Sequence, residues 1–239
     1  MALLTISGTA ADAACTAAAR MAGAIDARRG APGGVHIALA GGSTPRAAYE
    51  RLADQVPSWK GVELWLGDER VVPPDDPESN YRLVAETLLA ATQAAAHQVP
   101  TGGTAEDAAA SYSAEMRRRV AAGPSGVPVL DFALLGLGED GHTASLFPNH
   151  PALEARGEVC VAVHGAPKPP PDRVTLTLDV LRATRTAAIL AVGDGKADAV
   201  AATLAGPSPQ VPASLLADGP LELILDEAAA AKIPADAKA

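Results

Sequence analysis

Aromatic residues make up only 3% of the 239 residues of this chain, and its formal net charge at pH 7 is −9. A nucleic-acid-binding surface usually combines clustered cations with aromatic rings that stack on bases. The composition therefore argues against a nucleic acid partner. It does not argue against a small anionic ligand, because repulsion from distant charges is screened within about 10 Å at ordinary salt concentration.

Cysteine is also scarce, since Cys15 and Cys160 are the two that the sequence contains. Two cysteines cannot build a disulfide framework, and they fit a reducing compartment best. No apolar run approaches the roughly 18 residues of a membrane-spanning helix, and residues 1–25 lack the basic start of a secretory signal. We therefore expect a cytoplasmic protein with no membrane partner, and the sequence predicts no obligate protein partner.

Apolar residues make up 48% of the chain, and they gather in short runs that alternate with helical stretches. We expect strands at 35–40, 62–66, 129–135, 159–165, 186–192 and 221–225, helices at 9–29, 45–55, 80–89, 105–122 and 194–205, and a further regular element at 173–183. This alternation predicts an α/β fold with a doubly wound, mostly parallel, Rossmann-like sheet and helices on both faces. The length fits one domain over residues 1–239. In such sheets ligands bind at the carboxyl ends of the strands.

The first loop at such a strand end reads GGSTP, from Gly41 to Pro45. Glycines followed by hydroxyl residues and a proline are typical of a helix start, where free backbone amides converge and can bind a phosphate. The simpler interpretation is an ordinary capped turn between a strand and a helix. The loop has neither the Walker A spacing nor the G-x-G-x-x-G fingerprint of dinucleotide-binding proteins.

We expect the second loop directly after the next strand, and it begins with the charged residues Asp68, Glu69 and Arg70. A solvated charge cluster is the commoner outcome for such a run, but its position at a strand end favours a functional role. After the strand at 129–135 comes GLGEDGHTASLFP, in which Asp140 precedes His142 by two residues. Imidazole, with a reference pKa of about 6.5, is the natural general base near pH 7, and a nearby carboxylate can fix its tautomer.

Two isolated cations stand near the starts of later elements. Arg173 follows KPPPD at the start of 173–183, and Lys196 lies in GDGKADAV. Each alone is typical of a surface charge. Together with the GGSTP loop they can bind a phosphate, arginine by its planar fork and lysine as a point charge.

Five segments, in order between residues 35 and 225, resemble the signature segments of the 6-phosphogluconolactonase family, within the wider glucosamine-6-phosphate deaminase/isomerase superfamily. They read LAGGSTPRAAY, GDERVVPPDDPESNY, GLGEDGHTASLFP, PPPDRVTLTL and GDGKADAV. The resemblance implies a doubly wound α/β fold and hydrolysis of 6-phospho-D-glucono-1,5-lactone to 6-phosphogluconate in the oxidative pentose phosphate pathway. It implies catalysis by His142 with Asp140 behind it, and Asp68 as a further catalytic residue. The expected substrate-binding residues are Gly41, Gly42, Ser43, Thr44, Arg70, Arg173 and Lys196.

This chemistry needs a water, a base and stabilisation of the developing oxyanion. We expect His142 to deprotonate the water that attacks C1 of the lactone and Asp140 to hold its ring, while loop amides or Arg70 meet the oxyanion. Asp68, Glu69, Asp140 and His142 show no dedicated metal-ligand spacing, so we expect no metal and no cofactor. Small-molecule phosphosugar lactone is the expected partner.

Three alternatives are weaker. Ser145 does not lie in the G-x-S-x-G elbow of serine hydrolases. In sugar-phosphate deaminases the loop that corresponds to DGHTASLFP resembles DGHIAFNEP, with an acid where this chain has Phe147. A phenyl ring cannot transfer a proton, so this difference argues against a deaminase. A sugar-phosphate-sensing regulator needs a DNA-reading module, yet only about one helix precedes residue 35.

Overall fold

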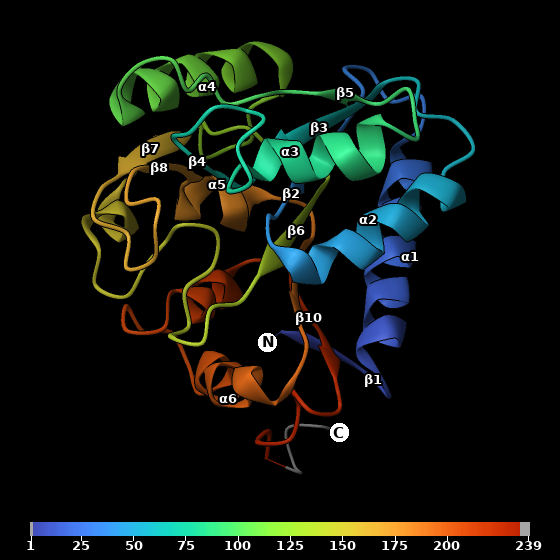
Figure 1. The fold of residues 1–239 in the computed structure, drawn as a ribbon, viewed down its shortest axis with the longest axis vertical. Coiled ribbons are helices and arrows are strands. Elements are labelled where there is room, and N and C mark those ends of the chain that lie inside the picture. Colours follow the sequence, from blue (N-terminus) through green and yellow to red (C-terminus); the bar gives the residue numbers. More distant parts are fainter. Residues whose placement is uncertain (1, 235–239) are drawn as a thin grey trace.

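A seven-stranded sheet forms the centre of the molecule (Figure 1), in the computed structural model that describes residues 2–234. Neighbouring strands are parallel throughout this sheet. In spatial order the strands are β1 (Leu3–Ser7), β10 (Leu221–Asp226), β9 (Ala187–Ala191), β6 (Phe132–Gly136), β2 (Val35–Leu39), β3 (Val62–Leu66) and β5 (Ala95–Ala96). The sheet is flanked by helices, so the predicted α/β, Rossmann-like fold class is confirmed.

The strand order reverses between β2 and β6. From β2 the chain runs outward through β3 to β5, and it then returns to place β6, β9 and β10 on the other side of β2. The loops that leave β2 and β6 therefore diverge, and in doubly wound sheets this divergence opens a crevice at the carboxyl ends of the strands. The GGSTP loop follows β2, and the loop with Asp140 and His142 follows β6.

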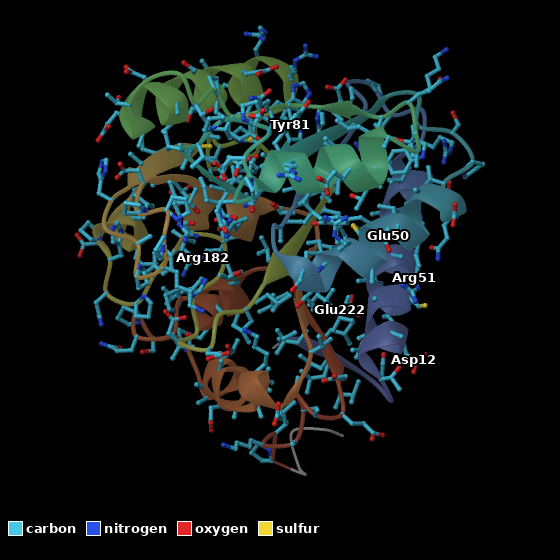
Figure 2. The ribbon with its side chains drawn as sticks, viewed as in Figure 1. Asp12, Glu50, Arg51, Tyr81, Arg182 and Glu222 are labelled. Carbon is cyan, nitrogen blue, oxygen red and sulfur yellow. The ribbon has the colours of Figure 1, made fainter. Side chains whose placement is uncertain are left out.

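Among the described residues, six α-helices lie between the strands: α1 (Ala10–Arg28), α2 (Ser43–Gln55), α3 (Asn80–Val84), α4 (Ala105–Arg119), α5 (Leu178–Ala183) and α6 (Ala197–Leu204). Helix α1 buries a row of alanines, which lets it pack closely against β10, β9, β6 and α2. Arg51 reaches from α2 towards α1 and donates from Nε to Cys15 Sγ at 3.0 Å (Figure 2). No helix among residues 2–234 has the length and apolar character needed to cross a membrane.

A second, smaller sheet was not predicted. Asp68–Arg70 form β4, which pairs antiparallel with β8 (Arg173–Leu176), and β8 pairs antiparallel with β7 (Cys160–Val163). Helix α4 covers this sheet (Figure 1). The expectation that Asp68–Arg70 lie in a loop was wrong, because partner strands far along the chain supply their backbone hydrogen bonds and override the low strand propensity of charged residues.

Two edge strands were also missed, while most element positions were confirmed. Strand β1 is a five-residue edge whose Leu3 side chain is 58% exposed, and β5 has only two residues. Neither has the fully buried apolar pattern that marks β2, β9 and β10. The element at 173–183 divides into strand β8 and helix α5, with Thr177 capping the helix. The expected helix at 80–89 is α3 continued by a π-helical turn over Ala85–Leu89.

Candidate active site

A cavity of about 410 Å³ lies where the loops after β2, β3, β6 and β9 meet. This volume is in the range of small-molecule sites. The predicted residues that line it are Gly41, Gly42, Ser43, Thr44, Asp68, Arg70, His142, Arg173 and Lys196. Asp140 does not line the cavity and lies behind His142. The structure therefore brings together residues that are far apart in the sequence, at the edge of the sheet where they were expected.

The GGSTP loop presents the start of α2 to the cavity. Gly42 is the N-cap residue with φ 96°, a backbone conformation that favours glycine. The helix begins at Ser43, two residues before Pro45, so the proline lies in the first turn where its missing N–H is tolerated. The backbone amides of Ser43 and Thr44 fall at the positive end of the helix dipole, which is a suitable place for an anion.

His142 and Asp140 form a pair in the loop after β6. Nδ1 of His142 lies 2.5 Å from Asp140 Oδ1, and the backbone N–H of His142 donates to the same oxygen at 3.2 Å. A Cβ at Gly138 would come within 2.0 Å of His142 Nδ1, so only glycine leaves room for the ring there. A carboxylate oxygen only accepts, so Nδ1 carries the proton and the lone pair of the neutral ring is on Nε2.

The charge of Asp140 is maintained by its partner. Burial alone would raise the pKa of the Asp140 carboxyl, but the hydrogen bond and charge of His142 outweigh it and hold that pKa below its usual range. The carboxylate therefore stays ionised at neutral pH and favours the imidazolium that forms when His142 takes up a proton.

Phe147 separates the histidine from Arg173. Its ring lies 4.7 Å from the His142 ring, between centroids, and Arg173 Cζ lies 5.6 Å from the Phe147 centroid. Phe147 lines the cavity and is itself buried. At the position where the resemblance implies an acid in deaminases, this chain thus has an apolar ring that packs against His142.

Arg173 is a buried cation, with 4% of its surface exposed. Its Nε and Nη2 donate to the carbonyl oxygens of Pro170 and Lys168 at 3.1 and 2.8 Å, and Nη1 lies 3.5 Å from Ser145 Oγ. Burial lowers the pKa of Arg173 and the neighbouring charge of Arg70 lowers it further, while Asp68 acts in the opposite direction. An anion bound in the cavity would relieve both unfavourable effects.

The neighbouring carboxylates Asp68 and Glu69 have different roles. Asp68 lines the cavity, whereas Glu69 points away from it and accepts hydrogen bonds from the backbone of Asn80 and Tyr81 at 2.7 Å. Burial raises the pKa of Glu69, and these backbone bonds counteract the rise. Glu69 therefore holds the first turn of α3, with Ser79 Oγ donating to it at 3.0 Å.

Arg70, the last residue of β4, also lines the cavity. Its Nη1 donates to the Glu78 carbonyl oxygen at 2.5 Å and lies 3.4 Å from Glu78 Oε2. Its buried Nε has no hydrogen-bond partner among the residues that the structure describes. This nitrogen is enclosed by protein atoms, so a ligand in the cavity meets Arg70 as a positive charge and not through Nε.

Asn80 and Lys168 are polar cavity residues that were missed from the sequence. Asn80 donates from Nδ2 to the carbonyl oxygen of Asp68 at 2.8 Å, and its amide fills the space beside Gly41, where a Cβ would come within 1.7 Å of Asn80 Oδ1. Lys168 lines the cavity as well. Both residues had an available signal, because Lys168 lies in the proline-rich segment that drew attention to Arg173, and Asn80 lies in the segment GDERVVPPDDPESNY.

The cavity is positive although the chain is acidic. Its charged lining consists of four cationic side chains and two carboxylates: Arg70, Lys168, Arg173 and Lys196, with Asp68 and Glu78. Low-dielectric walls concentrate such a field and favour an anionic ligand. The His142–Asp140 pair, the cationic side chains and the start of α2 thus meet at one cavity.

Comparisons with known proteins give a consistent result. Residues 8–225 match the family model described as glucosamine-6-phosphate isomerases/6-phosphogluconolactonase. A 6-phosphogluconolactonase of Streptomyces coelicolor is 38% identical over 234 residues, which cover 91% of this chain and 89% of that protein. The solved 6-phosphogluconolactonase from Trypanosoma brucei is similar with a TM-score of 0.89 at 28% identity, covering 98% of this chain and 99% of that one. A monomeric glucosamine-6-phosphate deaminase shares the fold, with a TM-score of 0.80 at 20% identity, covering 96% and 99%.

Proposed function

The chain belongs to the glucosamine-6-phosphate isomerase/6-phosphogluconolactonase family, and from this premise we propose how it acts. It is a lactone hydrolase of the 6-phosphogluconolactonase type, which converts 6-phospho-D-glucono-1,5-lactone to 6-phosphogluconate in the pentose phosphate pathway. The observation that carries the mechanism is the His142–Asp140 pair at the wall of a positive cavity.

The phosphate binds at the start of α2. The donors come from the backbone amides of Ser43 and Thr44 and from the side chains of Arg173 and Lys196. A charge-assisted hydrogen bond to phosphate is worth about 1.5–3 kcal/mol, so these groups together can select the phosphorylated lactone over the free one. Lys168 lies on the same wall as Arg173 and adds to the field.

His142 acts as the general base. Nε2 of the neutral ring accepts a proton from a water, and the resulting hydroxide adds to C1 of the lactone. Asp140 stabilises the imidazolium through the Nδ1 hydrogen bond. The tetrahedral intermediate then expels the ring oxygen, which takes the proton from the imidazolium, so that the open-chain acid is released and the base is regenerated.

The negative charge that develops on the carbonyl oxygen needs a donor. Arg70 lines the cavity with a cationic guanidinium, which makes it a candidate for this oxygen or for the phosphate. Asp68 was expected to be catalytic. Both of its carboxylate oxygens already accept hydrogen bonds, from Asn80 and Ser145, so we propose that it acts by its negative charge and not by proton transfer.

A direct test is turnover of freshly prepared 6-phosphogluconolactone, with the unaided hydrolysis measured in parallel and subtracted. We expect enzymatic turnover of the phosphorylated lactone and a much lower kcat/KM for gluconolactone, which lacks the phosphate. Equal kcat/KM for the two lactones would refute the phosphate site. Absence of turnover above the unaided rate would refute the function.

A further inference from the structure

Ser145 lies between two opposite charges, Asp68 and Arg173, which both line the cavity. Its side chain is fully buried, and its Oγ is 2.6 Å from Asp68 Oδ2 and 3.5 Å from Arg173 Nη1. Arginine has donors only and a carboxylate only accepts, so the single hydroxyl hydrogen is directed to Asp68 and a lone pair faces Arg173. One hydroxyl group therefore separates a carboxylate from a guanidinium.

The separation leaves the Arg173 charge uncompensated by direct contact. The other donors of Arg173 go to main-chain carbonyl oxygens, and no ion pair is found for it within the described part of the chain, residues 2–234. Asp68 is likewise held by neutral donors, through Asn80 at Oδ1 and Ser145 at Oδ2. A direct arginine–carboxylate pair would be bidentate and strong, and a phosphate would have to displace it.

We propose that Ser145 is a positioning residue that acts as a spacer: its hydroxyl keeps Asp68 from pairing directly with Arg173, so that Arg173 remains free to bind the substrate phosphate. The inference rests on the phosphate site proposed above and deepens it. It assigns Asp68 the role of a counter-charge that permits burial of Arg173 without neutralising its donors.

The backbone of Ser145 has a separate, structural task. Its N–H donates to Thr175 Oγ1 at 3.2 Å, which ties the loop after β6 to β8, and the preceding Ala144 has φ 49°. Ser145→Ala keeps this N–H and removes only the hydroxyl. The variant therefore distinguishes a spacer from a residue that merely holds the loop.

The test uses inorganic phosphate as the ligand and phosphorus NMR titration as the readout, with the full chain. In Ser145→Ala we expect Asp68 and Arg173 to pair and the Kd for phosphate to rise about tenfold, the scale of one lost charge-assisted hydrogen bond. Asp68→Asn cannot form the ion pair, so we expect it to bind phosphate as tightly as the wild type or more tightly. The double variant should recover, to within about threefold of Asp68→Asn.

Thr184→Val is the matched control, since it removes a buried hydroxyl that bonds the Val180 carbonyl oxygen on α5, away from the cavity lining. Its Kd should equal that of the wild type. An unchanged Kd in folded Ser145→Ala would overturn the proposal, as would a double variant that binds phosphate no better than Ser145→Ala. Should Ser145→Ala fail to fold, Asp68→Asn decides, because a Kd more than threefold above the wild type would mean that Asp68 supports Arg173 directly. Phosphate binding is measured without turnover. A wild-type protein that does not hydrolyse the lactone would therefore refute the proposed function, while the phosphate Kd values of the variants would still test the role of Ser145.

Discussion

Replacing Asp140 by asparagine removes the charge behind His142 with almost no change in shape. In the wild type the carboxylate accepts from His142 Nδ1 at 2.5 Å, and no other side chain holds that nitrogen in the described residues. The asparagine amide can offer an N–H to Nδ1, which would turn the ring to the tautomer with its proton on Nε2. A base with that nitrogen protonated cannot accept a proton from water.

The magnitude follows from the bond that is lost. A hydrogen bond between charged partners contributes about 1.5–3 kcal/mol, and at 1.36 kcal/mol per tenfold change the loss is roughly 10- to 160-fold in kcat. The altered tautomer adds to this loss. KM should change little, because Asp140 does not line the cavity where the substrate binds.

The assay is steady-state hydrolysis of fresh lactone between about pH 5.5 and 8.5, a range above the usual carboxyl pKa. The pKa of Asp140 is lowered in the wild type by His142 against the effect of burial, so the carboxylate stays charged throughout this range. Loss of kcat/KM towards acid pH should therefore follow protonation of one group, the imidazole. The matched control is Glu139→Gln, which removes a neighbouring charge outside the cavity lining and should leave kcat unchanged. A kcat for Asp140→Asn within threefold of the wild type would refute the assigned role.

Three further predictions concern the phosphate site, the reaction class and acid stability. Arg173→Ala and Lys196→Ala should each raise KM for the phospholactone, and the loss in kcat/KM should correspond to about 1.5–3 kcal/mol of transition-state stabilisation. Hydrolysis of gluconolactone should stay nearly unchanged. Equal losses for both lactones would contradict phosphate binding at these residues. Because Phe147 cannot relay a proton, glucosamine 6-phosphate should inhibit weakly and release no ammonia in a coupled assay, and ammonia release at about 1 s⁻¹ or faster would favour a deaminase. Burial lowers the pKa of His36, whose Nδ1 accepts a hydrogen bond from Trp65 Nε1 at 3.1 Å. Below about pH 6.5 the unfolded state therefore binds a proton that the folded state does not. The free energy of unfolding should decrease as the pH is lowered through this range. His36→Gln should weaken that dependence in urea unfolding followed by tryptophan fluorescence, and an identical pH dependence in both proteins would show that His36 does not contribute.

Local sequence predicted the parts of the site that depend on one loop. Gly41 and Gly42 before a helix, and Asp140 two residues before His142, are arrangements whose chemistry is visible over a few residues. Their meeting point was also predictable, since the carboxyl ends of parallel strands share one edge of the sheet. The structure places these loops on the two sides of the switch point between β2 and β6.

Partners distant in sequence account for what was missed. Asp68–Arg70 become a strand because β8 lies beside them, and Ser145 meets Asp68 across 77 positions of the chain. Asn80 matters because its amide lies against Gly41, a contact that no local pattern encodes. Such contacts arise from tertiary packing, which overrides the preferences of short segments.

The most direct test of the account compares wild-type protein with His142→Ala on freshly prepared 6-phosphogluconolactone, with the unaided hydrolysis subtracted. We expect kcat to fall by about 10²–10⁴ with little change in KM, the usual contribution of a positioned acid–base group. The melting temperature and the phosphate Kd should stay near the wild-type values, because His142 contacts Asp140 and Phe147 and is not one of the proposed phosphate donors. A folded His142→Ala protein that hydrolyses the lactone at the wild-type rate would contradict the assignment of His142 as the base.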